Sequence, residues 1–311
     1  MVKQISKNNQ NSYVLIISII LLALLSASLV LSINFGVADV PIEDIIKVLG
    51  EEILGLDYGI STGSNVFLKD IVWELRVPRI LLGMFAGGGL ALCGCIMQAV
   101  VKNPLANPYI LGISSGATLG ATSAIMLGFT MIGNLSIGFS AFLGALISSY
   151  VVYIIAHIGG RTNSVKLLLA GMAVNALCSA FSSFIVYTSA DAERTQKVTF
   201  WLMGSLAGGR WSSIAPVAVI VLGSSIFFLT QFRNLNLLLM GDEVAISLGT
   251  DLNRIRKIFL ILVSLIVGRI VWNCGTIGFV GLIIPHLVRI FVGTDHRKLI
   301  PISILIGALF L

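Results

Sequence analysis

The sequence predicts an all-α protein that crosses a lipid bilayer many times. Of its 311 residues, 57% are hydrophobic and 11% are charged, whereas soluble domains carry about 25% charged residues. The mean hydropathy is +1.00. The apolar residues come in blocks of about 20, which is the length that an α-helix needs to cross the hydrocarbon core.

Nine apolar segments are expected to form membrane helices within a single domain over residues 1–311. They lie at 13–35, 77–101, 109–131, 135–157, 165–189, 212–232, 257–273, 276–292 and from 299 onward. The first is longer than the apolar core of a signal peptide, so a retained helix is expected, with a signal peptide as the alternative. The last would hold only about 13 residues, too few to span, so we expect a truncated C-terminus.

Charge is distributed unevenly over the segments between these helices. With a cytoplasmic N-terminus, the inside segments hold twelve Lys and Arg against four acids, and the outside segments hold seven against ten. An excess of cations on the inside predicts this orientation in a cell membrane. The net charge of +6 therefore reflects topology, and we expect no nucleic-acid partner.

The outside segment from Gly36 to Asp70 contains apolar residues at helical period. A short amphipathic helix on the outer surface is expected there, with its apolar side formed by Ile42, Ile45, Ile46 and Leu49.

The stretch from Arg76 to Ala121 carries glycines four residues apart, on both sides of a polar hinge. They stand at positions 83 and 87 and at positions 112, 116 and 120. In lipid this spacing places small residues on one helix face, so that a neighbouring backbone can approach closely. The hinge contains two Asn-Pro pairs, which start turns, and Pro108 is expected at the first position of the next helix.

The four cysteines all lie in apolar segments, at Cys93, Cys95, Cys178 and Cys274. Cys93 and Cys95 are two residues apart and point to different sides of a helix. Neither a disulfide framework nor a metal site is indicated, and no cofactor is expected.

A polar segment from Gly241 to Lys257, GDEVAISLGTDLNRIRK, separates two expected membrane helices on the inside. It is expected to form short helices joined at a glycine in the left-handed conformation. Its apolar residues could dock into a groove of a partner protein: Val244, Ile246 and Leu248. The alternative is an ordinary amphipathic loop.

Three segments together resemble the FecCD-type permease subunits of ABC importers for iron-siderophores, haem and vitamin B12. They are 76–121, 241–257 and 275–301, the last with Gly-Phe-Val-Gly-Leu at 278–282 followed by Pro-His. The resemblance covers roughly residues 70–311. It implies a type II importer permease, with about ten membrane helices in the family and about nine in this chain. Segment 241–257 would then be the cytoplasmic coupling loop, contacting an ATPase through Glu243, Ala245, Leu248 and Gly249.

The resemblance implies a transport subunit and not an enzyme. The chain contains no Gly-x-x-x-x-Gly-Lys-Ser/Thr motif, which a P-loop needs to hold phosphates. Two separate ATPase subunits would supply the energy, and a second copy of the chain and a substrate-binding lipoprotein would complete the assembly. Arg76 and Arg79 would dock the binding protein, with interfacial snorkelling as the alternative. Ferric siderophore is the expected cargo, and cobalamin and haem stay open.

Arg269 would lie about 12 residues into the helix at 257–273, or about 18 Å deep at 1.5 Å per residue. An arginine inside the membrane usually faces a cavity or a partner, so Arg269 is a candidate for the translocation pathway. Asn273, Gln98 and Asn175 are further candidates. Snorkelling or capping by Arg269, and interhelical hydrogen bonds by the amides, are the alternatives.

Two other functions fit a many-pass membrane protein. An ion-coupled secondary transporter usually carries a buried carboxylate near the midplane, and the expected helices contain none. An intramembrane metalloprotease would carry His-Glu-x-x-His, which is absent.

Overall fold

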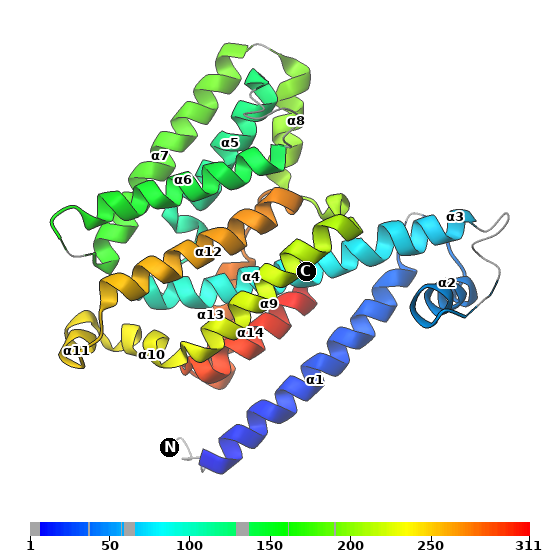
Figure 1. Cartoon of the computed structure of the whole chain (residues 1–311), viewed down its shortest axis with the longest axis horizontal. Helices are drawn as coiled ribbons and strands as arrows, with labels where there is room; N and C mark the ends of the chain where they lie inside the picture. Colours follow the sequence, from blue (N-terminus) through cyan, green and yellow to red (C-terminus); the bar gives the residue numbers. More distant parts are fainter. Residues whose placement is uncertain are drawn as a thin grey trace.

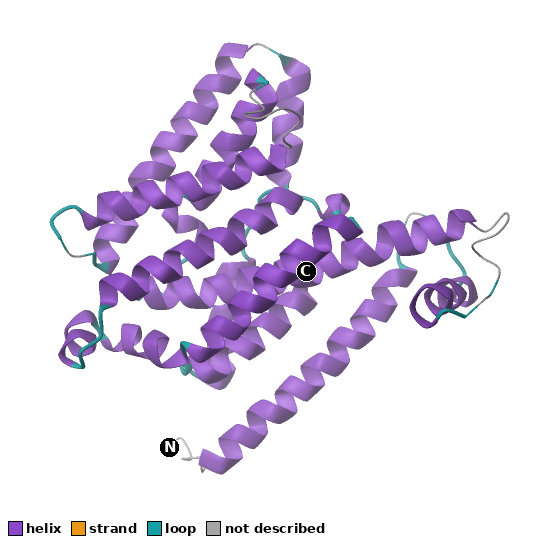
Figure 2. Ribbon diagram, in the orientation of Figure 1, coloured by secondary structure: helices purple, strands orange, loops and turns teal. Residues whose placement is uncertain are grey.

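The computed structural model describes residues 7–36, 38–56, 58, 66–128, 137–160, 162–189 and 191–311. Within these ranges the regular structure is entirely helical (Figure 2), which confirms the all-α prediction. The first half comprises α1 (Lys7–Asn34), α2 (Ile42–Leu54), α3 (Val66–Lys69), η1 (Asp70–Arg76), α4 (Val77–Val101), η2 (Pro108–Leu111), α5 (Ile113–Leu127) and α6 (Ile137–His157). The second half comprises α7 (Ser164–Ser189), α8 (Ala192–Met203), η3 (Leu206–Gly208), α9 (Trp211–Thr230), α10 (Phe232–Met240), α11 (Asp242–Ser247), α12 (Leu252–Cys274), α13 (Val280–Val292) and α14 (His296–Phe310).

Helix α4 forms the centre of the bundle (Figure 1). It continues α3 and the π-helical segment η1, so that 67–101 is one helical rod. It packs against α14, α13, α9 and α12, and every residue from Ala86 to Val101 is buried. Its apolar composition on every side is what a helix enclosed by other helices requires.

Five helices in the described ranges are long and apolar enough to cross a membrane. They lie at 13–34, 67–101, 137–157, 164–189 and 211–230. Helices α5 and α13 are apolar but shorter. Helix α12 has 23 residues, but its first two turns contain Arg254, Arg256 and Lys257, so that its apolar part is shorter.

The two glycine rows predicted from the sequence both lie at close helix contacts. A Cβ atom at Gly116 of α5 would lie 2.4 Å from the carbonyl oxygen of Gly144 in α6. A Cβ atom at Gly87 of α4 would lie 2.1 Å from the carbonyl oxygen of Gly307 in α14. The absence of side chains at these positions is therefore what allows the backbones to meet.

Several helix boundaries differ from the expected ones. The helix expected at 109–131 is preceded by the 3₁₀ turn η2, and α5 starts only after Gly112, whose φ is 72°. Residues 129–131 of that prediction lie outside the described residues. The helix expected at 257–273 begins at Leu252, because Asp251 caps it by accepting a hydrogen bond from the Arg254 amide at 3.1 Å.

Two further helix boundaries differ from the expected ones. The segment expected at 212–232 ends at Thr230, and a separate helix, α10, follows. The segment expected at 276–292 becomes helical only at Val280, after Phe279 with φ 65°.

The amphipathic helix expected in the segment 36–70 is present as α2. Its buried face consists of Ile45 and Val48, which pack in a small separate core with Ile33 and Val72. Ile42 and Ile46 are exposed instead. The buried face is rotated from the expected one because α2 packs on α1 and η1 rather than on a flat surface.

Candidate functional site

The short helix α11 lies between two glycines with positive φ. Gly241 has φ 114° and Gly249 has φ 79°, and an added Cβ atom would meet nothing within 4 Å at either position. The glycine between α11 and α12 thus adopts the left-handed conformation expected from the sequence. The second helix differs from that expectation, since it is the long membrane helix α12 and not a short one.

Apolar side chains of α11 and of the residue that follows it are exposed. Val244, Ile246 and Leu248 are 41%, 49% and 64% exposed. Glu243 is exposed as well, whereas Ala245 of the same helix is fully buried. Of the predicted coupling residues, Glu243 and Leu248 are accessible to a partner. Ala245 packs α11 against the bundle, and Gly249 supplies the turn.

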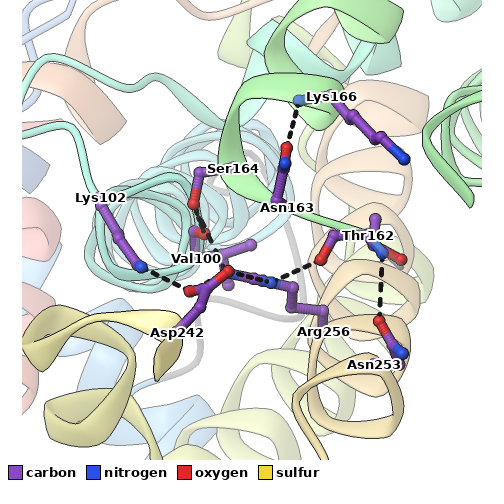
Figure 3. A network of polar contacts seen from close by, with 9 residues as sticks. All are labelled: Val100, Lys102, Thr162, Asn163, Ser164, Lys166, Asp242, Asn253 and Arg256. Atoms are coloured by element: carbon purple, nitrogen blue, oxygen red, sulfur yellow. Dashed lines mark hydrogen bonds and ion pairs between the residues drawn. The ribbon is translucent and has the colours of Figure 1, made fainter. Parts of the chain in front are cut away.

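Asp242, the first residue of α11, lies at the centre of a polar network (Figure 3). Its carboxylate accepts two hydrogen bonds from the Arg256 guanidinium, at 2.8 Å and 3.1 Å. The ammonium group of Lys102 pairs with the carboxylate oxygen that accepts the shorter bond. Two parallel bonds from a guanidinium fix both the distance and the orientation of a carboxylate.

The same network reaches the turn between α6 and α7. Arg256 donates to the main-chain oxygen of Thr162 at 2.7 Å. The Thr162 amide in turn donates to the side chain of Asn253 at 3.2 Å. The Ser164 hydroxyl donates to the Val100 carbonyl at the end of α4, also at 3.2 Å. Helices α4, α7, α11 and α12 are therefore joined by side-chain contacts at one end of the bundle.

Arg256 is only 1% exposed, although it is charged. A buried guanidinium needs partners that compensate for its lost hydration, and Asp242 and Thr162 supply them. Burial alone would raise the pKa of Asp242, but the hydrogen bonds and charges of Arg256 and Lys102 outweigh it and lower that pKa. The carboxylate is therefore ionised at neutral pH.

Sequence reasoning missed this network. Its one signal is that Arg256 falls among buried apolar residues at helical spacing on α12, between Leu252 and the pair Phe259 and Leu260. A cation on the buried face of a helix predicts a buried partner. The identity of that partner depends on tertiary contacts that no spacing reveals.

A groove of about 570 Å³ adjoins the network. It is lined by Lys102 and Asn163 on one side and by Met240, Asp242 and Val244 on the other. Among the residues that the structure describes, no group of three or more His, Cys, Asp or Glu side chains is placed to hold a metal ion.

The two arginines predicted to dock a binding protein have different environments. Arg76 is buried, and it donates to the Ile33 carbonyl at 2.6 Å and to the Ala38 carbonyl. It therefore joins η1 to the end of α1. Arg79 is exposed, so it is the arginine of the pair that remains available to a partner.

The candidate pathway residues do not come together in one place. Arg269 lies about 26 Å from the start of α12 at 1.5 Å per residue, farther along the helix than expected because α12 starts at Leu252. Its guanidinium carbon lies 4.4 Å from the centre of the Trp272 ring, a cation–π arrangement. Asn273 donates to the Arg269 carbonyl at 3.2 Å within the same helix.

Gln98 and Asn175 lie elsewhere in the bundle. Gln98 is 1% exposed. It donates to the Leu282 carbonyl at 3.3 Å and accepts from Arg289 at 2.8 Å. It therefore links α4 to α13, which agrees with interhelical hydrogen bonding. Asn175 is exposed on α7, on a face that this chain leaves uncovered.

Comparisons with known proteins agree on one family. The model of the FecCD transport family matches residues 14–311. The cobalamin import system permease protein BtuC of Halobacterium salinarum is 42% identical over 82% of this chain and 67% of its own length. The hemin transport system permease protein HmuU of Yersinia pestis is 38% identical over 86% of this chain and 82% of its own. A solved inward-facing conformation of a metal-chelate type ABC transporter superposes with a TM-score of 0.79, at 32% identity, over 94% and 87% of the two chains.

Proposed function

This chain belongs to the FecCD transport family, and on that premise we propose that it carries a metal chelate across the cell membrane with energy from a separate ATPase. It is a multi-pass permease with the type II importer fold, and it is not itself a catalytic subunit. The observation that supports coupling to an ATPase is α11. This helix exposes Glu243, Val244 and Ile246, and Leu248 directly after it is exposed as well. Side-chain bonds connect it to the ends of the membrane helices.

We place the α11 end of the bundle in the cytoplasm. The cations of this end include Lys102, Arg254, Arg256 and Lys257, and short cytoplasmic loops are enriched in Lys and Arg. The N-terminus then lies on the same side. Helix α2 lies beside α3, at the opposite end of the α3–α4 rod (Figure 1). Arg79 is in the first turn of α4, and we propose that a binding protein docks on this side.

The proposed assembly contains two copies of this chain, two ATPase subunits and a substrate-binding lipoprotein. Closure of the ATPase pair on nucleotide would displace α11, and the displacement would reorient the membrane helices around a pathway between the two copies. The chain itself performs no chemistry on the cargo. It would bind the ATPase through α11 and transmit the movement of α11 to the membrane helices.

The cargo that we propose is a bulky metal chelate. The relatives named above import cobalamin and hemin, and a ferric siderophore is our first candidate for this chain. The cognate binding protein selects among the three, so its affinity for each chelate decides the question.

The test is reconstitution in lipid vesicles with the ATPase and the binding protein. Uptake of chelate should require ATP hydrolysis and should stop when the ATPase is inactivated. A matched set of vesicles without the ATPase should show no flux under a proton or sodium gradient. Flux that follows such a gradient without the ATPase would identify a secondary transporter and refute the proposal.

A further inference from the structure

We propose that Asp242, Arg256 and Lys102 form an ionic latch that makes α11 move as one body with the membrane helices. The inference rests on the proposed function and adds positioning residues to it. None of the three would touch the cargo or nucleotide. Their role would be to convert displacement of α11 into displacement of α4, α7 and α12.

The latch is needed because of the backbone on both sides of α11. The helix has six residues, and an isolated helix of that length is unstable in water. The glycines at its two ends have no neighbours that would restrict an added Cβ atom, and glycine permits wide changes in φ and ψ. A partner that pushed on α11 alone would therefore rotate it about Gly241 and Gly249.

Asp242 prevents this rotation at the N-terminal end of α11. Its carboxylate is held by the Arg256 fork from α12 and by the Lys102 ammonium from the end of α4. Because Arg256 is almost fully buried, water does not compete for its bonds as it would at the surface. A short helix with an immobile first residue transmits force to the groups that hold that residue.

The contacts of Arg256 and Ser164 extend the latch to α7. The Thr162 carbonyl and the Ser164 hydroxyl stand at the start of α7 and bond to Arg256, at 2.7 Å and 3.4 Å. Lys102, Ser164 and Asp242 also line the groove at this end, and Figure 3 shows them within the network. Displacement of Asp242 would reach α12 and the end of α4 by direct contact, and α7 through Arg256.

The competing explanation is that the latch only stabilises the fold. A pair of variants separates the two roles. Asp242→Asn leaves the Arg256 charge buried without its counter-ion, which destabilises a protein strongly, whereas Asp242→Asn with Arg256→Gln removes both charges and relieves that cost. The double variant should therefore recover most of the thermal stability, but it has no latch. Asp295→Asn is the matched control, since Asp295 is likewise an aspartate at the start of a helix, where it caps α14 and accepts a hydrogen bond from Asn236 at 2.9 Å.

The readout is the number of ATP molecules hydrolysed per chelate imported by the reconstituted complex. We expect this ratio to rise about tenfold in both Asp242 variants, equivalent to about 1.4 kcal/mol of lost coupling, and to stay unchanged in Asp295→Asn. A ratio that returns to the wild-type value in the double variant along with stability would overturn the latch. A wild-type complex without ATP-driven uptake would instead refute the proposed function.

Hydrogen exchange on the purified chain tests the latch without any transport. The main-chain amides of 242–250 should exchange faster in the double variant than in wild type, while those of α4 outside its last turn keep their protection. Equal exchange in α11 would show that the helix is held by its apolar packing at Ala245 and would overturn the inference.

Discussion

Replacement of Gly116 by alanine should separate α5 from α6 and destabilise the bundle. The new Cβ atom would lie 2.1 Å from the Ser148 hydroxyl and 2.4 Å from the Gly144 carbonyl oxygen. Non-bonded contacts of Cβ atoms are essentially never below 3.0 Å, so the two backbones must part by about 0.6 Å, the difference between 3.0 and 2.4 Å.

Rotation of Ser148 cannot relieve the clash without loss. Its hydroxyl donates to the Gly112 carbonyl at 2.8 Å and lies 3.0 Å from the Ala145 carbonyl, and a hydroxyl turned away would lose these acceptors. Overpacking of this kind costs about 1–3 kcal/mol. At about 2–4 °C per kcal/mol for a domain of this order, the midpoint of thermal unfolding should fall by about 2–12 °C.

The assay is thermal unfolding of the detergent-purified chain, followed by loss of the monodisperse peak on size exclusion. Gly223→Ala is the control, because Gly223 lies inside α9 and an added Cβ atom there meets nothing within 4 Å. That variant should be neutral or slightly more stable, since alanine favours helix by about 1 kcal/mol over glycine. Equal midpoints for the two variants would refute the argument from backbone contact.

Four further predictions concern single charged residues. Arg79→Glu should weaken the affinity for the binding protein in a pull-down by about tenfold, and an unchanged affinity would contradict docking at Arg79. Arg76→Lys should mainly lower the midpoint of thermal unfolding, because lysine cannot reproduce the two guanidinium bonds to main-chain carbonyls. Arg269→Ala should reduce chelate uptake while the complex still assembles on size exclusion, and full uptake would exclude a role in transport. The stability lost in Asp242→Asn should shrink as pH falls below about 4, because a carboxylate with a lowered pKa stabilises the fold above its unfolded pKa and stops doing so on protonation; a difference that is constant from pH 7 to pH 3.5 would count against the ion pair.

The sequence predicted the class of fold and the approximate place of the five described helices that are long and apolar enough to cross a membrane, since apolar length and glycine spacing are local properties. It placed helix ends less well. Helix α12 begins at Leu252, before the apolar segment, because Asp251 caps it there. Hydropathy indicates which residues lie in lipid, and a helix can extend beyond them. Helix α5 starts late because Gly112 is left-handed, a conformation that sequence spacing does not specify.

The site was found in part. The motif located α11 and the exposed apolar residues in and after it. The partners of Asp242 come from the end of α4 and from α12, at separations that no periodic pattern connects. Arg76 was expected at the surface because cations near a membrane boundary usually reach towards water. The free carbonyls at the end of α1 instead gave it partners inside the protein.

Lys102 ends α4 with φ 55° and ψ 36°, a geometry in which a side chain with a Cβ atom is strained by about 1–2 kcal/mol. Glycine would remove that strain, yet it would also delete the ammonium group that meets Asp242. The left-handed backbone at position 102 thus favours glycine, whereas the ion pair with Asp242 requires a cation. A long cation keeps the contact with Asp242 at the cost of backbone strain. Random mutagenesis of codon 102 with selection for uptake should therefore return Lys or Arg. Selection for thermal stability alone should return Gly.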